Sequence, residues 1–267
     1  MKEFYSASTK SPSQLTNISE TSKVVFSRSQ VSPWLTFLAY SLGHNVVIPM
    51  YFGKIDILGQ ENIPKTGPVI LAPTHRSRWD SLLLPYATGR YVSGRDLRFM
   101  VTSSECQGIQ GWLVKRMGGF PVDTQKPAIA ALRHTVELIS QGEMLVIYPE
   151  GDIFRDSKVH PLKSGVARLA LNAEHLHLGL DIKIIPVAIN YSQPYPNWGT
   201  DVNIQIAEPI KVQDYIPGCL KQNAKKLIAD LTNRLQQLSH QQSKIISHPA
   251  DSLHEVWRKH RDEQVLS

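Results

Sequence analysis

The sequence is poor in cysteine. Its two cysteines, Cys106 and Cys219, lie far apart in a chain of 267 residues and form no CxxC pair. This spacing argues against a disulfide framework and against a cysteine-based zinc site, and it fits a reducing compartment.

Long basic runs with interleaved aromatic residues are also missing, so nothing predicts a nucleic-acid partner. The chain nevertheless contains 29 Lys and Arg against 23 Asp and Glu, for a formal charge of +6. A modest positive charge favours anionic partners such as acidic lipid surfaces or phosphorylated substrates, although it also helps to keep a protein in solution.

The N-terminus lacks the features of a secretory signal. Residues 1–23 are rich in Ser and Thr, with neither an apolar core nor a small-residue cleavage pattern. We predict a mobile tail over residues 1–30 and a polar tail over residues 243–267. The chain has no internal repeats, and with 42% hydrophobic and 19% charged residues it suits one large α/β domain with appendages.

One segment, Val31–Gly53, contains no Asp, Glu, Lys or Arg. It is long enough to cross a bilayer, but Gly43, His44, Asn45 and Pro49 interrupt it. Its aromatic residues are of the kind found at membrane interfaces. Three structures fit this pattern: a buried helix with a loop, a single span, or a broken, interfacial or re-entrant pair of short helices. We predict the third, as a membrane-associated helical segment over residues 31–53.

The rest of the chain alternates between short apolar runs and longer amphipathic stretches. This alternation predicts an α/β fold, with a mostly parallel mixed sheet flanked by helices. Strands are predicted in "YFGKIDILGQENIP", which leads into a loop, in "MLVIYPEG", which runs into a turn, and in "GPVILAP", "LRFMVTS", "IKIIPVAIN" and "DVNIQIAEPI". The stretch "GIQGWLVKRMGGFPVD" predicts a short helix, a glycine turn and a short strand. Helices are predicted in "SLLLPYATG", "KPAIAALRHTVELISQGE", "HPLKSGVARLALNAEHL", where a loop comes first, and "NAKKLIADLTNRLQQLSHQQ".

Two polar loops follow predicted buried strands. They are "THRSRWD", residues 74–80, and "YPEGDIFRD", residues 148–156. In open α/β sheets, functional side chains collect beyond the carboxyl ends of the strands. We therefore predict that both loops line one crevice.

His75 and Asp80 have the residue types of a general base and its orienting carboxylate. Imidazole titrates near neutral pH, and a carboxylate that accepts its second N–H fixes the tautomer and stabilises the imidazolium. The sequence has no GxSxG elbow and no cysteine beside His75, so the base would act directly on a substrate hydroxyl. Taken alone, the H-x4-D pattern is more typical of a capped helix behind a strand, and that interpretation stays open.

Four blocks in order resemble the glycerolipid acyltransferase superfamily, in particular the 1-acylglycerol-3-phosphate acyltransferase (PlsC-type) family. The resemblance extends from about Tyr51 to Pro209. The blocks are "THRSRWD"; "SSECQGIQGWLVKRMGGFPVD", with Glu105, Gly118, Phe120 and Asp123 in place; "YPEGDIFRD" followed by "PLKSG"; and "IIPVAI" around Pro186.

The resemblance implies an acyltransferase domain over residues 54–242 that serves phospholipid biosynthesis. It would move a fatty acyl group from acyl-CoA or acyl-carrier protein to the free hydroxyl of 1-acyl-sn-glycerol 3-phosphate, forming phosphatidic acid. His75 would be the base and Asp80 its orienting partner. No metal or cofactor is implied, because the acyl thioester is a co-substrate. Substrate contacts are implied at Glu150, Gly151, Arg155, Lys163, Arg78, Gly118, Phe120 and Pro121.

The same resemblance implies a lysolipid acceptor and a membrane-associated protein on the cytoplasmic face. Three alternatives stay open. The first is an acyltransferase for another lysophospholipid or hydroxylated lipid. The second is a hydrolase that passes the acyl group to water, and the third is a non-catalytic lipid-binding module.

The sequence departs from the family pattern where arginines are expected to face the acceptor's phosphate. Thr124 and Ile153 stand at the usual arginine positions, Asp152 at a usual threonine, and Thr74 at a usual asparagine. Asp152 would oppose a dianion if it pointed inward. Several basic residues lie close enough in sequence to supply the missing charge, or else form a solvated rim: Arg76, Arg78, Lys126, Arg155 and Lys163.

Overall fold

A computed structural model describes residues 29–102, 106, 108–122, 129–177, 179–216 and 218–247, without the side chains of residues 241–247. The two predicted tails lie mostly outside the described residues. Four of the residues singled out in the sequence lie outside them: Glu105, Asp123, Thr124 and Lys126.

The described residues alternate between strands and helices, as the sequence predicts. The strands are β1 Ile55–Leu58, β2 Val69–Pro73, β3 Leu97–Thr102, β4 Gly119–Val122, β5 Met144–Val146, β6 Lys183–Tyr191, β7 Val202–Ile206 and β8 Ile210–Lys211. The α-helices are α1 Pro33–Leu42, α2 Ile48–Tyr51, α3 Asp80–Thr88, α4 Arg90–Ser93, α5 Gly108–Arg116, α6 Ile129–Ser140, α7 Gly165–Leu176 and α8 Leu220–Ser247. Other helical turns are the π-helix Gly43–Val47 and the 3-10 turns Gln60–Asn62 and Val212–Tyr215.

All the strands belong to one eight-stranded sheet of order β1-β7-β6-β2-β5-β3-β4, with β8 beside β6. The strands from β6 to β4 run parallel, whereas β7 and β8 run antiparallel to β6. The predicted α/β class with a mostly parallel mixed sheet is confirmed. The direction of β7 was not predicted, although residues 192–201 are too short for the helical crossover that a parallel neighbour needs.

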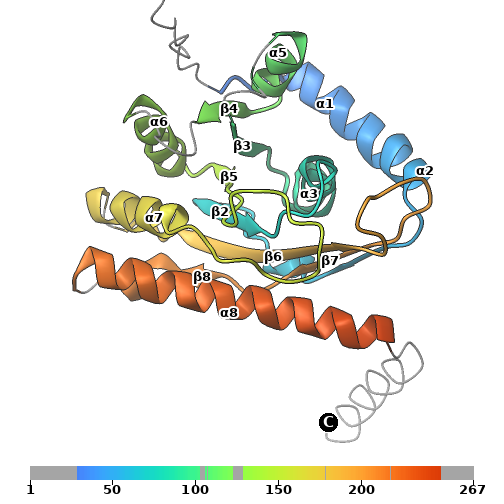
Figure 1. Cartoon of the computed structure of the whole chain (residues 1–267). Helices are drawn as coiled ribbons and strands as arrows, with labels where there is room; N and C mark the ends of the chain where they lie inside the picture. Colours follow the sequence, from blue (N-terminus) through green and yellow to red (C-terminus); the bar gives the residue numbers. More distant parts are fainter. Residues whose placement is uncertain are drawn as a thin grey trace, which may run out of the picture.

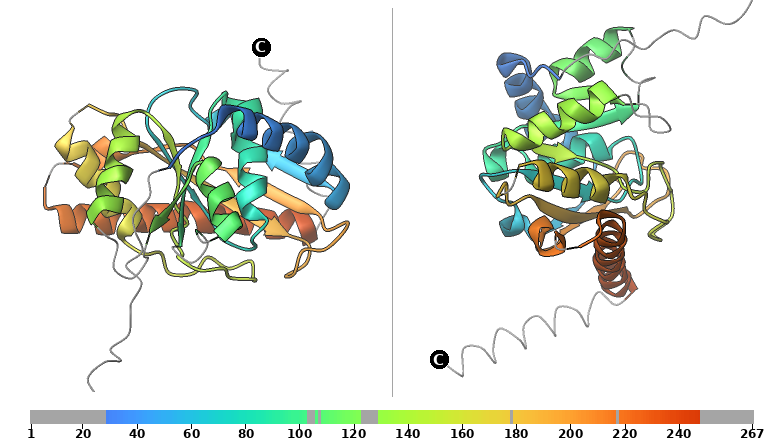
Figure 2. Two further views of the ribbon diagram at one scale, coloured as in Figure 1. Left: turned by 90° about the horizontal axis from the view of Figure 1, so that it is seen from above. Right: turned by 90° about the vertical axis from the view of Figure 1, so that its left-hand side faces the viewer.

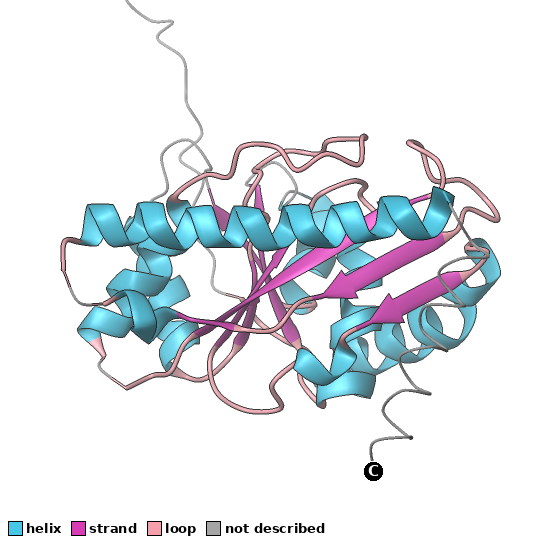
Figure 3. Cartoon of the chain, turned by 90° about the horizontal axis from the view of Figure 1, so that it is seen from below, coloured by secondary structure: helices cyan, strands magenta, loops and turns pink. Residues whose placement is uncertain are grey.

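Helices cover both faces of the sheet (Figure 1). In β2, Ile70 and Ala72 pack into one core with α6, α7 and α8. Val69 and Leu71 pack into a second core with α2 and α3. Burial on both faces explains why "VILAP" is apolar throughout rather than alternating. The long helix α8 packs against α7, β6 and β7, and Figure 3 shows it running along the sheet.

The uncharged segment forms α1 and α2, joined by the π-helical turn Gly43–Val47. The predicted interruption around Gly43 is therefore a π-turn in a continuous helical run over residues 33–51, which we call the N-terminal helix. One side of this run enters the core through Ile48 and Phe52. Its other side exposes large apolar side chains, namely Trp34, Phe37, Leu38, Leu42 and Met50. Among the residues described, no helix combines the length and apolar character that crossing a membrane requires.

The helices α1 and α5 lie at the end of the molecule opposite α8, as Figures 1 and 2 both show. The backbone joins them: Ser32 N donates to Arg116 O at 2.9 Å, and Val31 pairs with Met117 in an antiparallel bridge. The N-terminal helix is thus fixed to the body of the domain.

Candidate active site

Three neighbouring strands bring the predicted loops together. The parallel strands β5 and β6 both pair with β2, so their carboxyl ends lie side by side. His75 follows β2, Glu150 follows β5, and Tyr191 ends β6. The loops also bond directly, since His75 N donates to Glu150 Oε2 at 2.9 Å and Phe154 N donates to His75 O at 2.9 Å. The prediction that both loops meet in one crevice is confirmed.

His75 and Asp80 form the predicted contact, with 2.8 Å between His75 Nδ1 and Asp80 Oδ2. Asp80 is the first residue of α3, so the chain turns between the two residues and brings their side chains to the same side. The Asp80 carboxylate is fully buried, whereas 19% of the His75 side chain is exposed. Because a carboxylate accepts, the proton of the neutral imidazole lies on Nδ1, and Nε2 is the ring nitrogen that can accept a hydrogen bond.

The free-energy cost of burying the Asp80 carboxylate is offset by further hydrogen bonds that it accepts. The backbone N–H groups of Arg76 and Ser77 donate to Oδ2 at 2.7 and 2.9 Å, and the Tyr191 hydroxyl donates to Oδ1 at 2.6 Å. Burial, and then the Asp80 charge, raises the pKa of Tyr191 well above its ordinary value, so the phenol stays protonated and donates. Tyr191 was not predicted, because only the strand order places the end of β6 beside the first loop.

The Tyr148 ring stacks on the His75 imidazole, with 3.9 Å between ring centroids and 23° between planes. Burial, and secondarily the charge of Asp80, raises the pKa of the Tyr148 phenol well above its ordinary value. A nearly parallel ring at this distance restricts rotation of the imidazole. Sequence analysis did not single out Tyr148, although it opens the third block.

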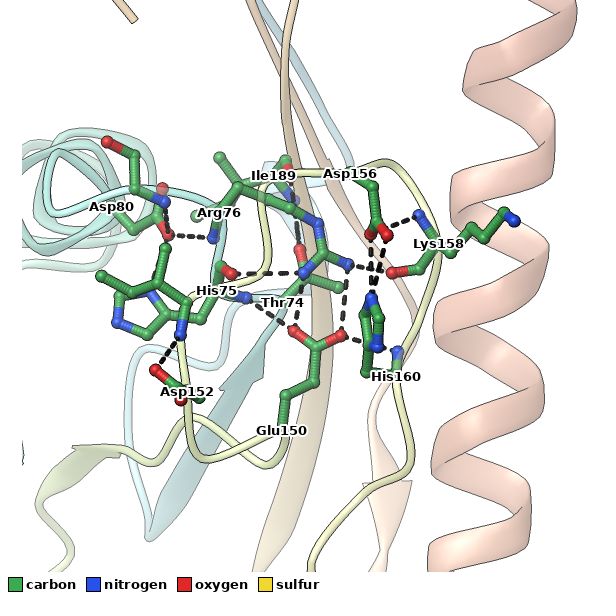
Figure 4. A network of polar contacts seen from close by, with 12 residues as sticks. Thr74, His75, Arg76, Asp80, Glu150, Asp152, Asp156, Lys158, His160 and Ile189 are labelled. Carbon is green, nitrogen blue, oxygen red and sulfur yellow. Dashed lines mark hydrogen bonds and ion pairs between the residues drawn. The ribbon is translucent and has the colours of Figure 1, made fainter. Parts of the chain in front are cut away.

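Glu150 supports the two loops rather than facing a substrate. Arg76 donates to its two carboxylate oxygens at 2.8 and 3.2 Å, and His160 N donates to Oε1 at 2.9 Å (Figure 4). Arg76 also donates to Lys158 O at 2.8 Å. Both side chains of this ion pair are buried. Arg76 is therefore committed to Glu150, which contradicts the expectation that it could hold the acceptor's phosphate.

A cavity of about 750 Å³ extends from His75 to the N-terminal helix. Thr36, Tyr40 and His44 of that helix form one wall. Most of the remaining lining is apolar, including Ile48, Leu82, Phe99, Leu113, Val122 and Leu169. Concave, largely apolar cavities of this size are typical of small-molecule and lipid sites.

Charged residues of the two loops also line this cavity. Arg78 comes from the first loop, Asp152 from the second, and Lys163 from the segment before α7. Gly151 has φ of +75°, and a Cβ there would collide with the Lys163 side chain, so this position needs glycine. Arg155 was also predicted to contact the substrate. Its guanidinium lies over the Tyr195 ring, 4.5 Å from the ring centroid, and Arg155 does not line the cavity.

The second block contacts the cavity through residues other than those predicted. Gly118 forms a turn with φ of +94°, where a Cβ would lie 2.6 Å from Leu97 O. Phe120 is fully buried in the core, and Pro121 is buried in β4. Gly118, Phe120 and Pro121 do not line the cavity, whereas the neighbouring Gly119 and Val122 do.

The fold and the site together define an α/β protein with a histidine–aspartate pair at the carboxyl edge of its sheet and a largely apolar cavity beside that histidine. Comparison with known proteins agrees, because a model of the family described as "Acyltransferase" matches residues 54–190. The chain belongs to this acyltransferase family.

Curated relatives are glycerolipid acyltransferases. The chain is 27% identical over 119 residues to a 1-acyl-sn-glycerol-3-phosphate acyltransferase of Bacillus subtilis, covering 44% of this chain and 57% of that protein. It is 25% identical over 173 residues to the enzyme of that name from Streptococcus pneumoniae, covering 62% and 57%. It is 31% identical over 136 residues to the mitochondrial glycerol-3-phosphate acyltransferase 1 of Sus scrofa, covering 47% and 16%. The chain thus spans little more than half the length of the bacterial relatives and a small part of the mitochondrial one.

A solved structure shares the fold. The crystal structure of the 1-acyl-sn-glycerophosphate (LPA) acyltransferase PlsC from Thermotoga maritima aligns with a TM-score of 0.56 at 19% identity. The alignment covers 76% of this chain and 79% of that chain. At this level of identity the likeness concerns the fold alone.

Proposed function

We propose that this protein transfers a fatty acyl group from acyl-CoA or acyl-carrier protein to the free hydroxyl of 1-acyl-sn-glycerol 3-phosphate, forming phosphatidic acid. The observation that carries the proposal is the 2.8 Å contact between His75 Nδ1 and Asp80 at the wall of an apolar cavity. The names of the bacterial relatives support the choice of acceptor.

In the proposed mechanism, Nε2 of His75 removes the proton of the acceptor hydroxyl while the oxygen attacks the thioester carbonyl carbon. Asp80 stabilises the imidazolium that forms. The tetrahedral intermediate then collapses, the C–S bond breaks, and the leaving thiolate takes the proton from Nε2. The reaction balances without a metal or cofactor, so the prediction that none is needed is kept as part of the proposal.

The cavity would hold the acyl chain of one of the two substrates. Its lining is mostly apolar and leads from His75 toward α1, so a chain lying in it would leave its reactive end beside the imidazole. Arg78 and Lys163 would face the acceptor's phosphate as cations on the same cavity wall.

We place the exposed side of α1 and α2 at a membrane surface on the cytoplasmic side. Trp34 and Phe37 are 65% and 64% exposed, and Met50 is 60% exposed. Aromatic and apolar side chains on the outer side of a helix suit the boundary between headgroups and acyl chains. Docking there would let a lipid acceptor reach His75 without crossing water.

Another lysolipid is the second candidate acceptor. Two of the basic residues expected at the phosphate, Arg76 and Arg155, do not line the cavity, and the carboxylate of Asp152 does. This arrangement favours a headgroup that carries less negative charge than a phosphomonoester.

The direct test supplies the purified protein with an acyl thioester and 1-acyl-sn-glycerol 3-phosphate. We expect phosphatidic acid and free thiol to appear in equal amounts. Thiol released without an acceptor, together with free fatty acid, would indicate a hydrolase. Binding of lysolipids without turnover on any acceptor would indicate a lipid-binding module.

A further inference from the structure

The charged part of the cavity wall contains a carboxylate beside a cation. Asp152 and Lys163 both line the cavity. Asp96 lines it too, but Arg90 neutralises Asp96 by donating to it from Nη2 at 2.8 Å. Among the cavity-lining residues described, Asp152 is therefore the carboxylate without a cationic partner.

Asp152 and Lys163 meet at the same turn. The side chain of Lys163 lies over Gly151, the residue next to Asp152. Asp152 Oδ1 accepts a hydrogen bond from Ile153 N at 2.8 Å, which holds the carboxylate in place. In Figure 4 it lies on the same side of the second loop as the His75 ring. Within the described part of the chain, neither Asp152 nor Lys163 forms an ion pair.

A headgroup bound next to His75 would therefore meet the Asp152 carboxylate together with the lining cations Arg78 and Lys163. A phosphomonoester carries close to two negative charges at neutral pH, whereas a phosphodiester carries one. The second charge of a monoester would be repelled by Asp152, while an ammonium on a diester headgroup would find a partner there.

We infer that Asp152 determines acceptor specificity, and that the site takes lysophospholipids whose phosphodiester headgroup carries an ammonium group in addition to the phosphomonoester acceptor. This inference rests on the proposed acyl transfer to a lysolipid hydroxyl. It assigns Arg78 and Lys163 to the phosphate and Asp152 to the ammonium.

The test compares three lysolipids with the same acyl chain, all below their critical micelle concentrations. One has a phosphomonoester headgroup, one a glycerol phosphodiester and one an ethanolamine phosphodiester. Equilibrium binding of each is measured without acyl donor for the wild-type protein and for Asp152→Asn, which keeps an oxygen acceptor for Ile153 N and removes the charge.

We expect Asp152→Asn to bind the phosphomonoester about fivefold more tightly and the ethanolamine diester about fivefold more weakly, as befits a partly exposed charge. The glycerol diester should change by less than about twofold, because it carries neither a second negative charge nor an ammonium. The ratio of phosphomonoester affinity to ethanolamine-diester affinity would thus change about 25-fold.

The matched control is Asp156→Asn. Asp156 lies on the same loop and is exposed, but it pairs with His160 and does not line the cavity. Its removal should leave the three affinities in their wild-type ratios. Equal ratios in the wild type and Asp152→Asn would overturn the inference, and so would equal changes in Asp152→Asn and Asp156→Asn.

Turnover with an acyl thioester separates this inference from the proposed function. If the affinities shift as expected but no lysolipid is acylated, Asp152 reads the headgroup and the proposed acyl transfer is wrong. If all three lysolipids are acylated with the same selectivity in the wild type and in Asp152→Asn, acyl transfer stands and the inference about Asp152 fails.

Discussion

The first and second loops each contribute an aspartate to a histidine–aspartate pair, and the two pairs have nearly the same contact distance. His75 Nδ1 lies 2.8 Å from Asp80, and His160 Nε2 lies 2.9 Å from Asp156. Their surroundings differ, because the Asp80 side chain is fully buried whereas that of Asp156 is 50% exposed.

The neighbours of each carboxylate explain what the difference means. Asp80 also accepts from two backbone N–H groups and from Tyr191, and its histidine opens into the apolar cavity. Asp156 accepts from Lys158 N at 3.2 Å, and its histidine stacks on Phe154 at 3.7 Å between centroids, away from the cavity. Contact distance alone therefore does not identify a catalytic pair, whereas burial and access to a substrate space do.

Removing the two imidazoles gives the largest expected contrast. His75→Ala should lower kcat for acyl transfer about 10⁴-fold, because it deletes the general base. His160→Ala should stay within about threefold of wild type, since a surface side chain away from the reacting atoms contributes little to the chemical step. Steady-state kinetics with a common thioester donor would measure both, and comparable losses in the two variants would contradict the distinction.

Neutralising the two carboxylates comes next. Asp80→Asn should lower kcat about a thousandfold, because an amide cannot hold the Nδ1–H tautomer or stabilise the imidazolium. Asp156→Asn should leave kcat nearly unchanged. The pair is compared by single-turnover assays, with circular dichroism to show that both variants are folded; a mild effect of Asp80→Asn would remove Asp80 from the mechanism.

Deleting the tyrosine hydroxyl behind Asp80 tests whether that hydroxyl positions the carboxylate of the proposed catalytic pair. Tyr191→Phe should lower kcat about tenfold with little change in KM, because it removes a charge-assisted hydrogen bond from a positioned carboxylate.

Tyr215→Phe is the matched control for Tyr191→Phe. The Tyr215 hydroxyl donates to Asp230 at the same distance of 2.6 Å, but Asp230 belongs to α8 and neither residue lines the cavity. Tyr215→Phe should therefore leave both kcat and KM unchanged. If the two variants behave alike, Tyr191 has a purely structural role.

The smallest effect is a pH dependence of stability at the exposed pair. Burial opposes ionisation of Asp156, but the hydrogen bond and charge of His160 outweigh it and lower the pKa of this carboxyl below its usual 3.8. Because the pKa is lower in the folded state, the ionised carboxylate stabilises the folded protein at pH values above the pKa of the unfolded state. This contribution is lost as the pH falls through the pKa of the folded state. The Tm advantage of wild type over Asp156→Asn should therefore shrink between pH 5 and pH 3; a constant difference across this range would contradict the assignment.

The sequence predicts the part of the structure that local patterns encode. Apolar runs and helical periodicity place the strands and helices of the domain, and the H-x4-D spacing brings His75 against Asp80 through a single turn. The antiparallel direction of β7 was within reach, because the connection before it is too short for a crossover helix.

Long-range partners could not be predicted in the same way. Arg76 looks available for phosphate beside His75, but Glu150, 74 residues later, takes its guanidinium. Tyr191 reaches Asp80 across 111 residues, which only the strand order reveals. The direction of a surface side chain is equally hidden, and Arg155 turns to Tyr195 while Asp152 turns to the cavity.

The N-terminal helix has a consequence for how the chain is divided into fragments. The family match starts at residue 54, yet Tyr40 and His44 close the cavity and Ile48 and Phe52 lie in the core. A fragment trimmed to the matched boundary would expose the apolar face of α3 and leave the cavity without one wall. The smallest piece that keeps this wall of the cavity therefore begins before Pro33.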